Sequence, residues 1–531
     1  MLNQQNNQQK AVAYHANARS CAELVPWLFP YNDRIVIDKD SSLLACFEFE
    51  GLDTDSVTVS QLNSQASIAE YANKIFADKP ITVWWTVNRK RTTYYPGGTF
   101  PDEVSQAMDD RRRVMFEKGN NRINRHTLAI VMTPNIGKQK FVARLRRMMM
   151  LEEGISYWQA GIEALKSLVS DQQAFAYLRD ELNVAVERFE DLLTSFTGAF
   201  GSTVRFTRFT GDDLATYLSR EFSDINDQQS VMMPEHWFLD SYLPDCHVTP
   251  GHDFLEFSGS KQAFAKVLTV KTFPQPQGEE PRGHTVPGML DKLMTVPGDI
   301  KFTQVFRYAS KAESGKYISA VKRYNDVAKY GWKGMLMGAV KGSMDGIAVN
   351  KGREKDVNQI GDAEGNLSVD QGTTGWYNCT VVCYGDTLEQ ANDLTDIVES
   401  TIRNAKFIPF PEKEHCLSAW AGTIPGQHGE IVRWLFLDNA NVANLMPLRT
   451  VSRGQVVNEY LTEQLGTPCP PLAVMPTDYG TPYYYVHYVM HVGHKMAIIA
   501  QRREKVKLAF SRLRGGEKST FCTRMIVCVG I

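Results

Sequence analysis

The stretch RIVIDKDSSLLACFEF at residues 34–49 decides the fold class of this chain of 531 residues. It predicts two strands joined by a polar turn at Lys39–Ser42, because apolar residues flank the turn on both sides. The second strand carries apolar side chains that alternate imperfectly along the chain. These side chains are Leu44, Cys46, Phe47 and Phe49. The first predicted elements are therefore β-strands.

Helices and strands alternate in the segments that follow. A helical pattern covers about 59–76, and the apolar strand TVWWTV lies at 82–87. Pro101 suits the first position of a helix that runs to about Phe116, and another apolar strand, TLAIVM, occupies 127–132. This order predicts an α+β or α/β layer, and we take α+β as the fold class.

The remainder of the chain repeats the alternation without a visible sequence repeat. Residues 138–197 are predominantly helical, and 350–376 form an exposed excursion rich in Gly, Asp, Asn and Lys. Thr210 and Asp386 are the expected N-caps of two helices. Strands are predicted at 266–274, 301–307 and 378–385, and helices at about 210–222, 288–295, 312–345 and 386–405.

Five regions follow from these patterns. They are a polar arm at 1–30, an amino-terminal α+β domain at 31–200, a central α+β region at 201–480, the start of a further sheet at 481–500, and an atypical basic tail at 501–531.

Composition excludes several classes of protein. Hydrophobic residues make up 43% and charged residues 22%, as in ordinary globular proteins, and the net charge of -2 argues against wholesale coating of nucleic acid. No window of 18 uninterrupted apolar residues predicts a membrane span. The opening MLNQQNNQQK lacks both the basic first region and the apolar second region of a secretory signal peptide. We therefore expect a cytosolic chain, with peripheral membrane attachment left open.

The cysteines and histidines predict no metal site. Cys379 and Cys383 lie in the apolar run WYNCTVVCYG, which favours reduced thiols in a buried strand. His487, His491 and His494 have a spacing that would bring zinc ligands together on a helix. The surrounding aromatic and β-branched residues favour strands instead, where that spacing does not converge.

Phosphate-binding and catalytic motifs are missing from the 531 residues. For the pattern G-x-x-x-x-G-K-[ST], Gly315 and Lys316 have Ser310 in place of the first glycine and Tyr317 in place of the hydroxyl residue. A second candidate at Gly516–Ser519 fails because Glu517 replaces the required glycine. G-x-S-x-G and H-E-x-x-H are also absent.

Two charged segments have simple structural interpretations. Asp109 and Asp110 beside Arg111–Arg113 predict a charge-paired surface on one helix rather than an acid and base pair. Basic residues among Phe141, Leu145 and three methionines predict a solvated helix face, with binding to acidic lipid or nucleic acid as the alternative. These basic residues are Lys138, Lys140, Arg144, Arg146 and Arg147. We assign no catalytic residue, no in-frame cofactor-binding residue and no metal ligand.

Several segments, taken in order, resemble the conjugative-transfer and type IV secretion ATPases of the CagE/TrbE/VirB family. The segment at 35–56 resembles the family's opening strand pair and its turn, with Gly51, Asp53, Asp55 and Ser56 at the turn. The segment at 83–116 is similar to the family in the placement of a further set of residues. These are Tyr95, Pro96, Phe100, Asp109, Arg111 and Arg112.

The resemblance continues to about residue 500. Later matching segments are 127–134, 267–274, 376–394, 419–427, Arg433 and 441–448. It implies ATP-driven conjugative transfer of DNA or protein by an oligomer at the cytoplasmic face of the bacterial inner membrane. It also implies contacts with other secretion components there, and ATP and Mg in the complete family member.

The family's P-loop does not follow where the resemblance places it. Gly493, His494 and the apolar residues at 496–499 match the strand before the loop, but 501–531 contain eight basic and two acidic residues and no P-loop. A possible coding string for Ala500–Lys507 reads Pro-Thr-Ala-Gly-Lys-Ser-Glu in a shifted frame. We hypothesise that a frameshift has replaced the motor domain, so the P-loop domain is expected to be largely absent. The nucleotide sequence of the gene tests this.

Three functional hypotheses remain at this stage. The chain is the non-motor part of a secretion ATPase, with little or no ATP hydrolysis by itself, since it supplies no Walker A lysine, Walker B acid or arginine finger. Alternatively, it is a docking or assembly subunit without enzymatic activity. A weaker interpretation is a nucleic-acid binder that uses 138–147 and the tail.

Overall fold

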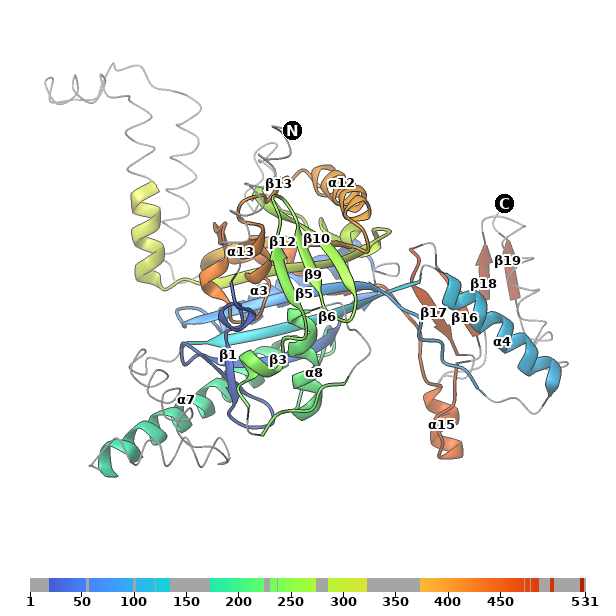
Figure 1. Cartoon of the computed structure of the whole chain (residues 1–531), viewed down its shortest axis with the longest axis horizontal. Coiled ribbons are helices and arrows are strands. Elements are labelled where there is room, and N and C mark those ends of the chain that lie inside the picture. The colour runs from blue at the N-terminus through green and yellow to red at the C-terminus, as the bar shows by residue number, and fades with distance from the viewer. Residues whose placement is uncertain are drawn as a thin grey trace, which may run out of the picture. The chain divides into compact units, whose positions relative to one another are not determined.

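The computed structural model divides the chain into two compact units (Figure 1). The first comprises residues 1–88 and 125–450, and the second comprises residues 89–124 and 451–531. Two strands run from one unit into the other, β5 (Ile81–Arg91) and β6 (Arg122–Met132). The described residues are 19–53, 57–98, 102–119, 121–133, 172–223, 230–235, 237–273, 285–321, 373–471, 473–477, 479–486, 497–500 and 526–529.

A sheet of 13 strands forms the centre of the first unit. Its path is β1-β2-β3-β6-β5-β11-β12-β10-β9-β8, and β7, β14 and β13 pair with β3, β12 and β10. The pair of β11 and β12 is antiparallel over the full length of β11. Besides β5 and β6, the strands are β1 (Trp27–Pro30), β2 (Val36–Asp38), β3 (Leu43–Glu50), β7 (Arg205–Arg208), β8 (His247–Pro250), β9 (Leu255–Ser258), β10 (Gln262–Thr272), β11 (Asp299–Tyr308), β12 (Thr374–Gly385), β13 (Ile408–Pro411) and β14 (Leu435–Asp438).

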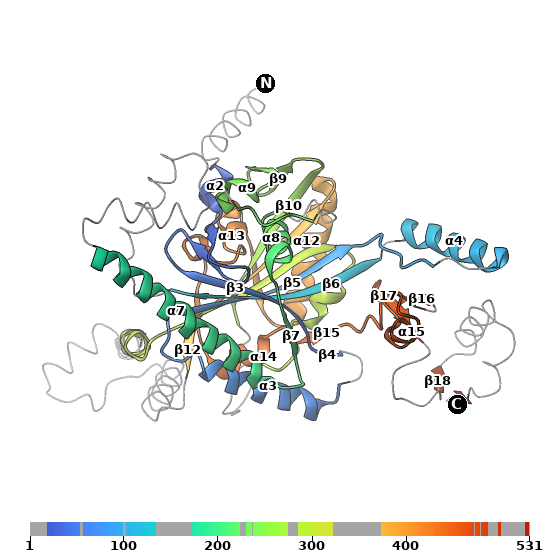
Figure 2. The same cartoon turned by 90° about the horizontal axis from the view of Figure 1, so that it is seen from below.

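Helices cover both faces of this sheet, as Figure 2 shows for α3, α7 and α14 on one side and α2, α9 and α13 on the other. The first face is covered by α3 (Val59–Lys74), α7 (Gln172–Ala199), α12 (Leu388–Asn404) and α14 (Asn439–Leu445). The second is covered by α2 (Cys21–Leu24), α8 (Gly211–Phe222), α9 (Leu239–Tyr242) and α13 (Cys416–Ala421). The short 3-10 helices are η1 (Asp291–Thr295) and η2 (His428–Glu430), and residues 311–321 are also helical.

Burial on both faces explains the imperfect alternation of the strands. In β5, Trp85 packs into the core beneath α3 and α7, whereas the adjacent Trp84 packs into the core on the opposite face. Leu43 and Leu44 of β3 divide between the two cores in the same way. A strand buried on both faces has no reason to alternate apolar with polar residues.

Among its described residues, the second unit has two helices and two small sheets besides the ends of β5 and β6. Strands β16 and β17 are antiparallel, and β18 and β19 are parallel. The elements are α4 (Glu103–Lys118), α15 (Glu459–Leu465), β16 (Ala473–Pro476), β17 (Pro482–Tyr485), β18 (Ala497–Ala500) and β19 (Ile526–Val529). Within 481–500, β17 and β18 belong to two different two-stranded sheets, and β19 lies in the segment 501–531.

The prediction of a polar arm at 1–30 is wrong for residues 19–30. Leu24, Trp27 and Leu28 are buried, and β1 pairs with β2 as part of the large sheet. The polar composition of the first ten residues does not continue to residue 30, because VPWLFP at 25–30 is apolar. Residues 1–18 lie outside the described ranges.

The boundary predicted between 31–200 and 201–480 crosses one continuous sheet. Strands from both predicted regions are neighbours in it, since β5 lies beside β11 and β3 pairs with β7. The unit boundaries instead fall within β5 and β6 and after residue 450. Pairing between strands distant in sequence gives no local signal at residue 200.

Several local predictions need correction. Residues 291–295 form a 3-10 helix, not an α-helix. The side chain of Thr387 caps α12 by accepting from the Gln390 N–H, so Asp386 is not the N-cap. Thr210 occupies the N-cap position of α8, but its side chain makes no capping hydrogen bond. Residues 374–376, predicted to lie in an exposed excursion, belong to β12.

The coarse fold class is confirmed. Helices and strands mix around a layered sheet, and the predicted strands at 82–87, 127–132, 266–274 and 301–307 correspond to β5, β6, β10 and β11. Of the helix predicted at 312–345, residues 311–321 are described. None of the helices in the described ranges is long and apolar enough to cross a lipid bilayer.

Replacing Trp27 by alanine tests whether β1 belongs to the core. The side chain is fully buried, and its Nε1–H donates to the Pro425 carbonyl oxygen at 2.8 Å. We expect Trp27→Ala to lower the free energy of unfolding by about 3–5 kcal/mol, measured by urea unfolding with circular dichroism. Trp237, which is 67% exposed, is the matched control, and Trp237→Ala should change stability by less than about 0.5 kcal/mol. Equal effects would exclude a core role for β1.

Candidate functional site

The turn at Gly51 lies against the end of the segment 441–448, and both belong to the family resemblance. A Cβ atom added at Gly51 would lie 1.7 Å from the Leu448 carbonyl oxygen, so the contact admits only glycine. Immediately beyond it, β4 (Leu52–Asp53) pairs in parallel with β15 (Arg449–Thr450). Gln65 of α3 donates to the same Leu448 carbonyl at 2.8 Å.

A buried ion pair fixes the position of Arg449, the residue that follows Leu448. Arg449 is 4% exposed, and its Nη2 donates to Asp291 Oδ1 at 3.0 Å while Nε bonds to Oδ2. This bidentate geometry is the strong form of a guanidinium and carboxylate contact. It attaches β15 to η1, so residues 51–53, 291 and 449–450 form one closed junction. No sequence pattern points to Asp291 or Arg449 as partners.

Side-chain amides hold α14 against α3. Asn73 Nδ2 donates to Asn439 Oδ1 at 2.8 Å, and Asn439 Nδ2 donates to the Glu70 carbonyl at 2.7 Å. The Tyr308 hydroxyl donates to Asn73 Oδ1 at 2.6 Å. Burial raises the pKa of Tyr308 well above its ordinary value, so the hydroxyl remains a donor. Each buried polar group in this chain of contacts has a partner.

Arg433, a position of the resemblance, pairs with a buried carboxylate. Its Nη2 donates to Glu412 Oε2 at 3.2 Å, and its guanidinium lies 4.0 Å from the centre of the Phe410 ring. Thr269 of β10 also donates to Glu412. Because the Glu412 side chain is 1% exposed, the arginine supplies the charge that permits its burial. Sequence reasoning misses Glu412, whose only signal is its place as an acid directly after the apolar strand IPFP.

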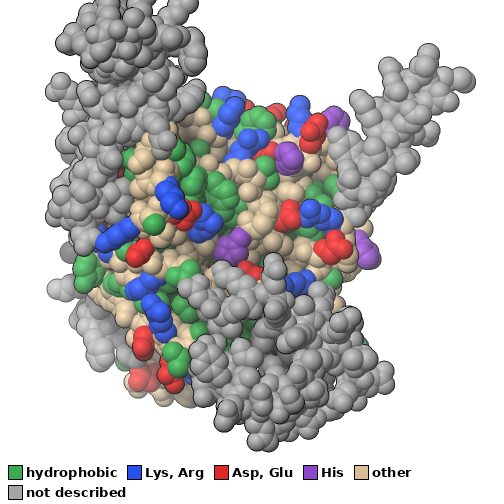
Figure 3. Space-filling view, turned by 90° about the vertical axis from the view of Figure 1, so that its left-hand side faces the viewer, with side chains coloured by type: hydrophobic (Ala, Val, Ile, Leu, Met, Phe, Trp, Pro, Cys, Tyr) green, Lys and Arg blue, Asp and Glu red, His purple; other side chains and the backbone are tan. Residues whose placement is uncertain are grey.

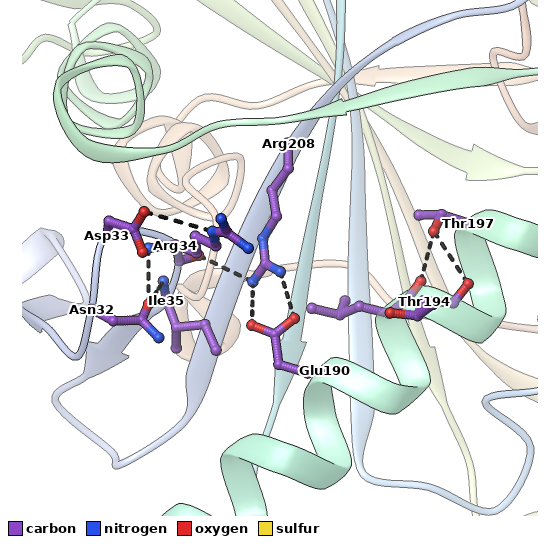
Figure 4. Close-up of polar contacts among 9 residues, drawn as sticks. Asn32, Asp33, Arg34, Ile35, Glu190, Thr194, Thr197 and Arg208 are labelled. Carbon is purple, nitrogen blue, oxygen red and sulfur yellow. Dashed lines mark hydrogen bonds and ion pairs between the residues drawn. The ribbon is translucent and has the colours of Figure 1, made fainter.

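Figure 4 shows a similar contact near the start of the resemblance. Arg208 of β7 donates to Glu190 Oε1 of α7 at 2.9 Å and to the Arg34 carbonyl at 3.4 Å. The Asn32 side chain accepts from the backbone N–H groups of Arg34 and Ile35, both at 2.8 Å. These contacts join α7, β7 and the turn before β2.

In the second unit, Tyr95 and Asp109, two positions of the resemblance, are in contact. The Tyr95 hydroxyl donates to Asp109 Oδ1 at 2.8 Å, and Arg113 lies 3.7 Å from Oδ2. The Phe116 ring lies 5.5 Å from the Tyr95 ring. Burial, followed by the bond to Asp109, raises the pKa of Tyr95, so its hydroxyl stays protonated at neutral pH.

This cluster confirms charge pairing within one helix, between Asp109 and Arg113, and corrects the expectation that Asp109 lies on the surface. Asp109 is 8% exposed, whereas Asp110 and Arg111 are exposed. The arginine that approaches Asp109 is Arg113, one turn along the helix. Gly97 allows this, because a Cβ there would lie 2.3 Å from Arg113 Nη2. Phe100 lies outside the described residues.

The remaining sequence candidates contribute no catalytic geometry. Cys379 and Cys383 are buried on β12, as predicted, and burial raises the pKa of each to about 12, which keeps the thiols protonated. Gly315 and Lys316 lie in the helical residues 311–321, not in a loop. Within the described ranges no group of three His, Cys, Asp or Glu side chains has the geometry of a metal site. Outside those ranges lie His487, His491, His494, the basic residues at 138–147, and Gly516–Ser519.

The surface of the first unit carries both signs of charge. On the face in Figure 3, Lys and Arg side chains are interspersed with Asp and Glu, and hydrophobic side chains lie between them. A mixed surface of this kind does not favour a broad contact with phosphate groups.

Comparison with known proteins agrees with the family resemblance. The sequence model described as "Type IV secretion system ATPase VirB4/TrbE, N-terminal domain" matches residues 34–139. The conjugal transfer protein TrbE of Rhizobium radiobacter is 21% identical over 498 residues, which is 91% of this chain and 56% of that protein. Residues 34–139 thus match the amino-terminal domain of VirB4/TrbE proteins, and most of the chain is similar to a TrbE protein.

Two further relatives agree with this assignment. The type IV secretion system protein virB4 of Bartonella henselae is 19% identical over 88% of this chain and 53% of that protein. A probable conjugal transfer protein TrbE of Sinorhizobium fredii is 28% identical over 24% of this chain and 87% of that protein. The chain spans about half the length of the TrbE and virB4 relatives that match most of it.

The VirB4/TrbE segments thus meet at two structural centres. The junction at Gly51 joins the first matched segment to 441–448, and the Tyr95 cluster joins the middle of the segment 83–116 to its carboxyl-terminal part. The polar side chains at both centres bond to one another or to the backbone. Their arrangement supports positioning of chain segments.

Replacing Gly51 by alanine tests the junction. The added methyl group would collide with a backbone oxygen, so we expect Gly51→Ala to separate β4 from β15 and to lower the free energy of unfolding by about 1–3 kcal/mol. Urea unfolding measures this. Gly198 in α7 is the control: it has no atom within 4 Å of an added Cβ, so Gly198→Ala should raise stability by roughly 0.5–1 kcal/mol. Destabilisation by both variants to the same degree would refute the steric argument.

Replacing Tyr95 by phenylalanine tests the second centre. The variant leaves Asp109 without its hydroxyl donor, and we expect thermal unfolding to show a loss of about 1–3 kcal/mol. The neighbouring Tyr94 is 60% exposed, so Tyr94→Phe should have little effect. If the two variants melt alike, the bond to Asp109 contributes nothing to stability.

Proposed function

We propose that this chain acts as a non-motor component of a bacterial type IV secretion or conjugative transfer machine. The observation that carries the proposal is similarity over 88–91% of the chain to relatives named TrbE and virB4. In addition, the 531 residues contain no P-loop motif. Its task is docking: it binds other secretion components and positions them.

We place this activity at the cytoplasmic face of the inner membrane, with peripheral contact to the membrane. The chain acts as a homo-oligomer with other secretion components as partners. ATP and Mg belong to the complete VirB4/TrbE protein, where a Walker A lysine, a Walker B acid and an arginine finger stabilise the transferred phosphoryl group. The 531 residues contain no in-frame Walker A motif, so this chain by itself hydrolyses little or no ATP.

Physical support comes from the hydrogen bonds and ion pairs that the described polar side chains make within their own unit. Arg433, Arg449 and Asp109 each bond to partners of the same unit, and Glu412 is buried with its arginine. Such contacts hold surfaces in fixed positions, which a docking subunit needs. They leave these groups unavailable as acids, bases or nucleophiles in the described ranges.

Affinity capture without nucleotide tests the proposal. The tagged full chain is added to detergent-solubilised inner membranes from cells that carry the cognate secretion genes, after apyrase treatment to remove ATP. We expect mass spectrometry to find inner-membrane secretion components enriched over membranes from cells without those genes. The same preparation should show no ATP hydrolysis above that of a mock purification.

Two results would contradict the proposal. One is equal recovery from membranes with and without the secretion genes, which would remove the docking role. The other is ATP hydrolysis that copurifies with the chain through every purification step, because this would require a nucleotide site within the 531 residues.

A further inference from the structure

Asp38, the last residue of β2, carries a buried carboxyl group that makes no hydrogen bond. The residue is 1% exposed, and neither Oδ1 nor Oδ2 has a hydrogen-bond partner. Oδ2 lies against Gly426, where an added Cβ atom would be only 2.5 Å from it, and the ring of Pro26 borders the same space. Buried polar groups are nearly always hydrogen-bonded, so this exception needs a physical explanation.

Other buried acids of the first unit show what an ionised carboxylate requires in this protein. Three of them, with side chains at most 1% exposed, lie against a lysine or an arginine. They are Glu221 with Lys301 at 2.6 Å, Asp240 with Lys39 at 2.9 Å and Glu412 with Arg433 at 2.5 Å. None of the described ion pairs includes Asp38. Because an unpaired charge costs far more to bury than a neutral acid, the geometry favours the protonated form of Asp38.

The charges of the turn that follows β2 act on Asp38 in opposite directions. Burial raises the pKa of Asp38 well above its ordinary value, the negative charge of Asp40 raises it further, and Lys39 lowers it. The Lys39 ammonium group is itself bonded to Asp240 of α9 and to the Ala22 carbonyl oxygen of α2. The positive charge nearest in sequence to Asp38 is therefore already paired with another acid.

Two titratable groups from neighbouring elements are electrically neutral at neutral pH. The β3 strand contributes Cys46, whose pKa burial raises, so the thiol keeps its proton. The 3-10 helix η2 contributes His428, which interacts electrostatically with Asp40 and whose pKa burial lowers. Neither group offsets a negative charge on Asp38.

Asp38 lies where the turn before η2 closes on β1 and β2. Trp27 of β1 pairs with Asp38 in the strand register and donates to the Pro425 carbonyl at 2.8 Å. On the other side of the turn, Gln427 Nε2 donates to the Leu24 carbonyl at 2.6 Å. Together with the carboxyl group these bonds form one contact, which we call the Asp38 latch. Its residues are Leu24, Trp27, Asp38, Pro425, Gly426 and Gln427.

We infer that Asp38 is a proton-controlled latch: its protonated carboxyl group lets the turn at 424–428 close on β2, and loss of the proton opens this contact. An ionised carboxylate requires donors or water, and water reaches this group only when the turn moves away. The two sides of the latch belong to separate segments of the VirB4/TrbE resemblance, 35–56 and 419–427. The inference is independent of the docking role, since its tests measure only the proton and the contact.

Infrared difference spectroscopy on the full chain at neutral pH detects the proton. The C=O stretching band of a protonated carboxylic acid is separate from the bands of a carboxylate, and we expect the unsubstituted chain to lose such a band in Asp38→Asn. Asp33 is the matched control: its side chain is 62% exposed, so Asp33→Asn should leave the band unchanged. No loss of a carboxylic acid band in Asp38→Asn would overturn the inference.

Urea unfolding from about pH 5 to about pH 9 tests the linkage between the proton and folding. Because the folded chain holds a proton that the unfolded chain releases, the unsubstituted chain should lose stability relative to Asp38→Asn as the pH rises, until the pH passes the raised pKa of Asp38. Within that interval its unfolding equilibrium constant should grow by up to about tenfold per pH unit relative to the variant. Parallel pH profiles of the two proteins would contradict the inference.

The variant Asp40→Asn provides a second test that keeps the Asp38 carboxyl group. It removes a negative charge that raises the pKa of Asp38, so the loss of stability should end at a lower pH than in the unsubstituted chain. A profile that ends at a higher pH would count against the neutral state of Asp38.

Amide hydrogen exchange at matched pH measures the opening itself. As the pH rises, peptides that cover 24–30 and 422–428 should exchange faster in the unsubstituted chain than in Asp38→Asn, whereas the intrinsic exchange rate is the same in both. Peptides from β11 serve as the internal control and should exchange alike. Equal exchange at 422–428 in the two proteins at every pH would show that the proton does not control the contact, and the latch would be excluded.

Discussion

Burial of the large sheet on both faces is the constraint on which the first unit depends. Polar side chains that are buried on the sheet are stabilised by partners within the protein. Lys301 of β11 and Glu221 of α8 illustrate this: both side chains are 1% exposed, and Lys301 Nζ lies 2.6 Å from Glu221 Oε2. Asn88 donates to the other carboxylate oxygen at 3.0 Å. Removing either charge would leave the other buried and uncompensated.

The same constraint closes the chain on itself between its first described residues and residues 410–450. Trp27 bonds to the Pro425 carbonyl, Gln427 Nε2 donates to the Leu24 carbonyl at 2.6 Å, and Gly51 lies against Leu448. The segments that resemble VirB4/TrbE proteins are therefore neighbours in the core although the sequence separates them widely. Because these segments contact one another in the folded chain, similarity to VirB4/TrbE proteins at about 20% identity is consistent with this architecture.

The second unit is built differently, from an insertion at 89–124 and from residues after 450. Arg89 is buried there, and its guanidinium donates to Asn124 Oδ1 at 3.1 Å and to the Tyr479 carbonyl at 2.6 Å. Arg122 N–H donates to the Gly480 carbonyl at 2.9 Å. These bonds join the two segments of the chain.

Local sequence determined the strands and helices of this protein, because apolar runs such as TVWWTV and the periodic residues of 59–76 favour one backbone conformation by themselves. The order of short segments in the sequence also showed the resemblance to VirB4/TrbE proteins, because that order can be read without knowledge of the fold. Only the tertiary structure decided that 27–30 belong to the sheet, that Glu412 pairs with Arg433 and Asp291 with Arg449, and that the domain boundary falls within β5 and β6. These features depend on contacts between residues up to about 400 positions apart, such as Trp27 with Pro425, and periodicity within a window of 10–20 residues carries no information about such partners.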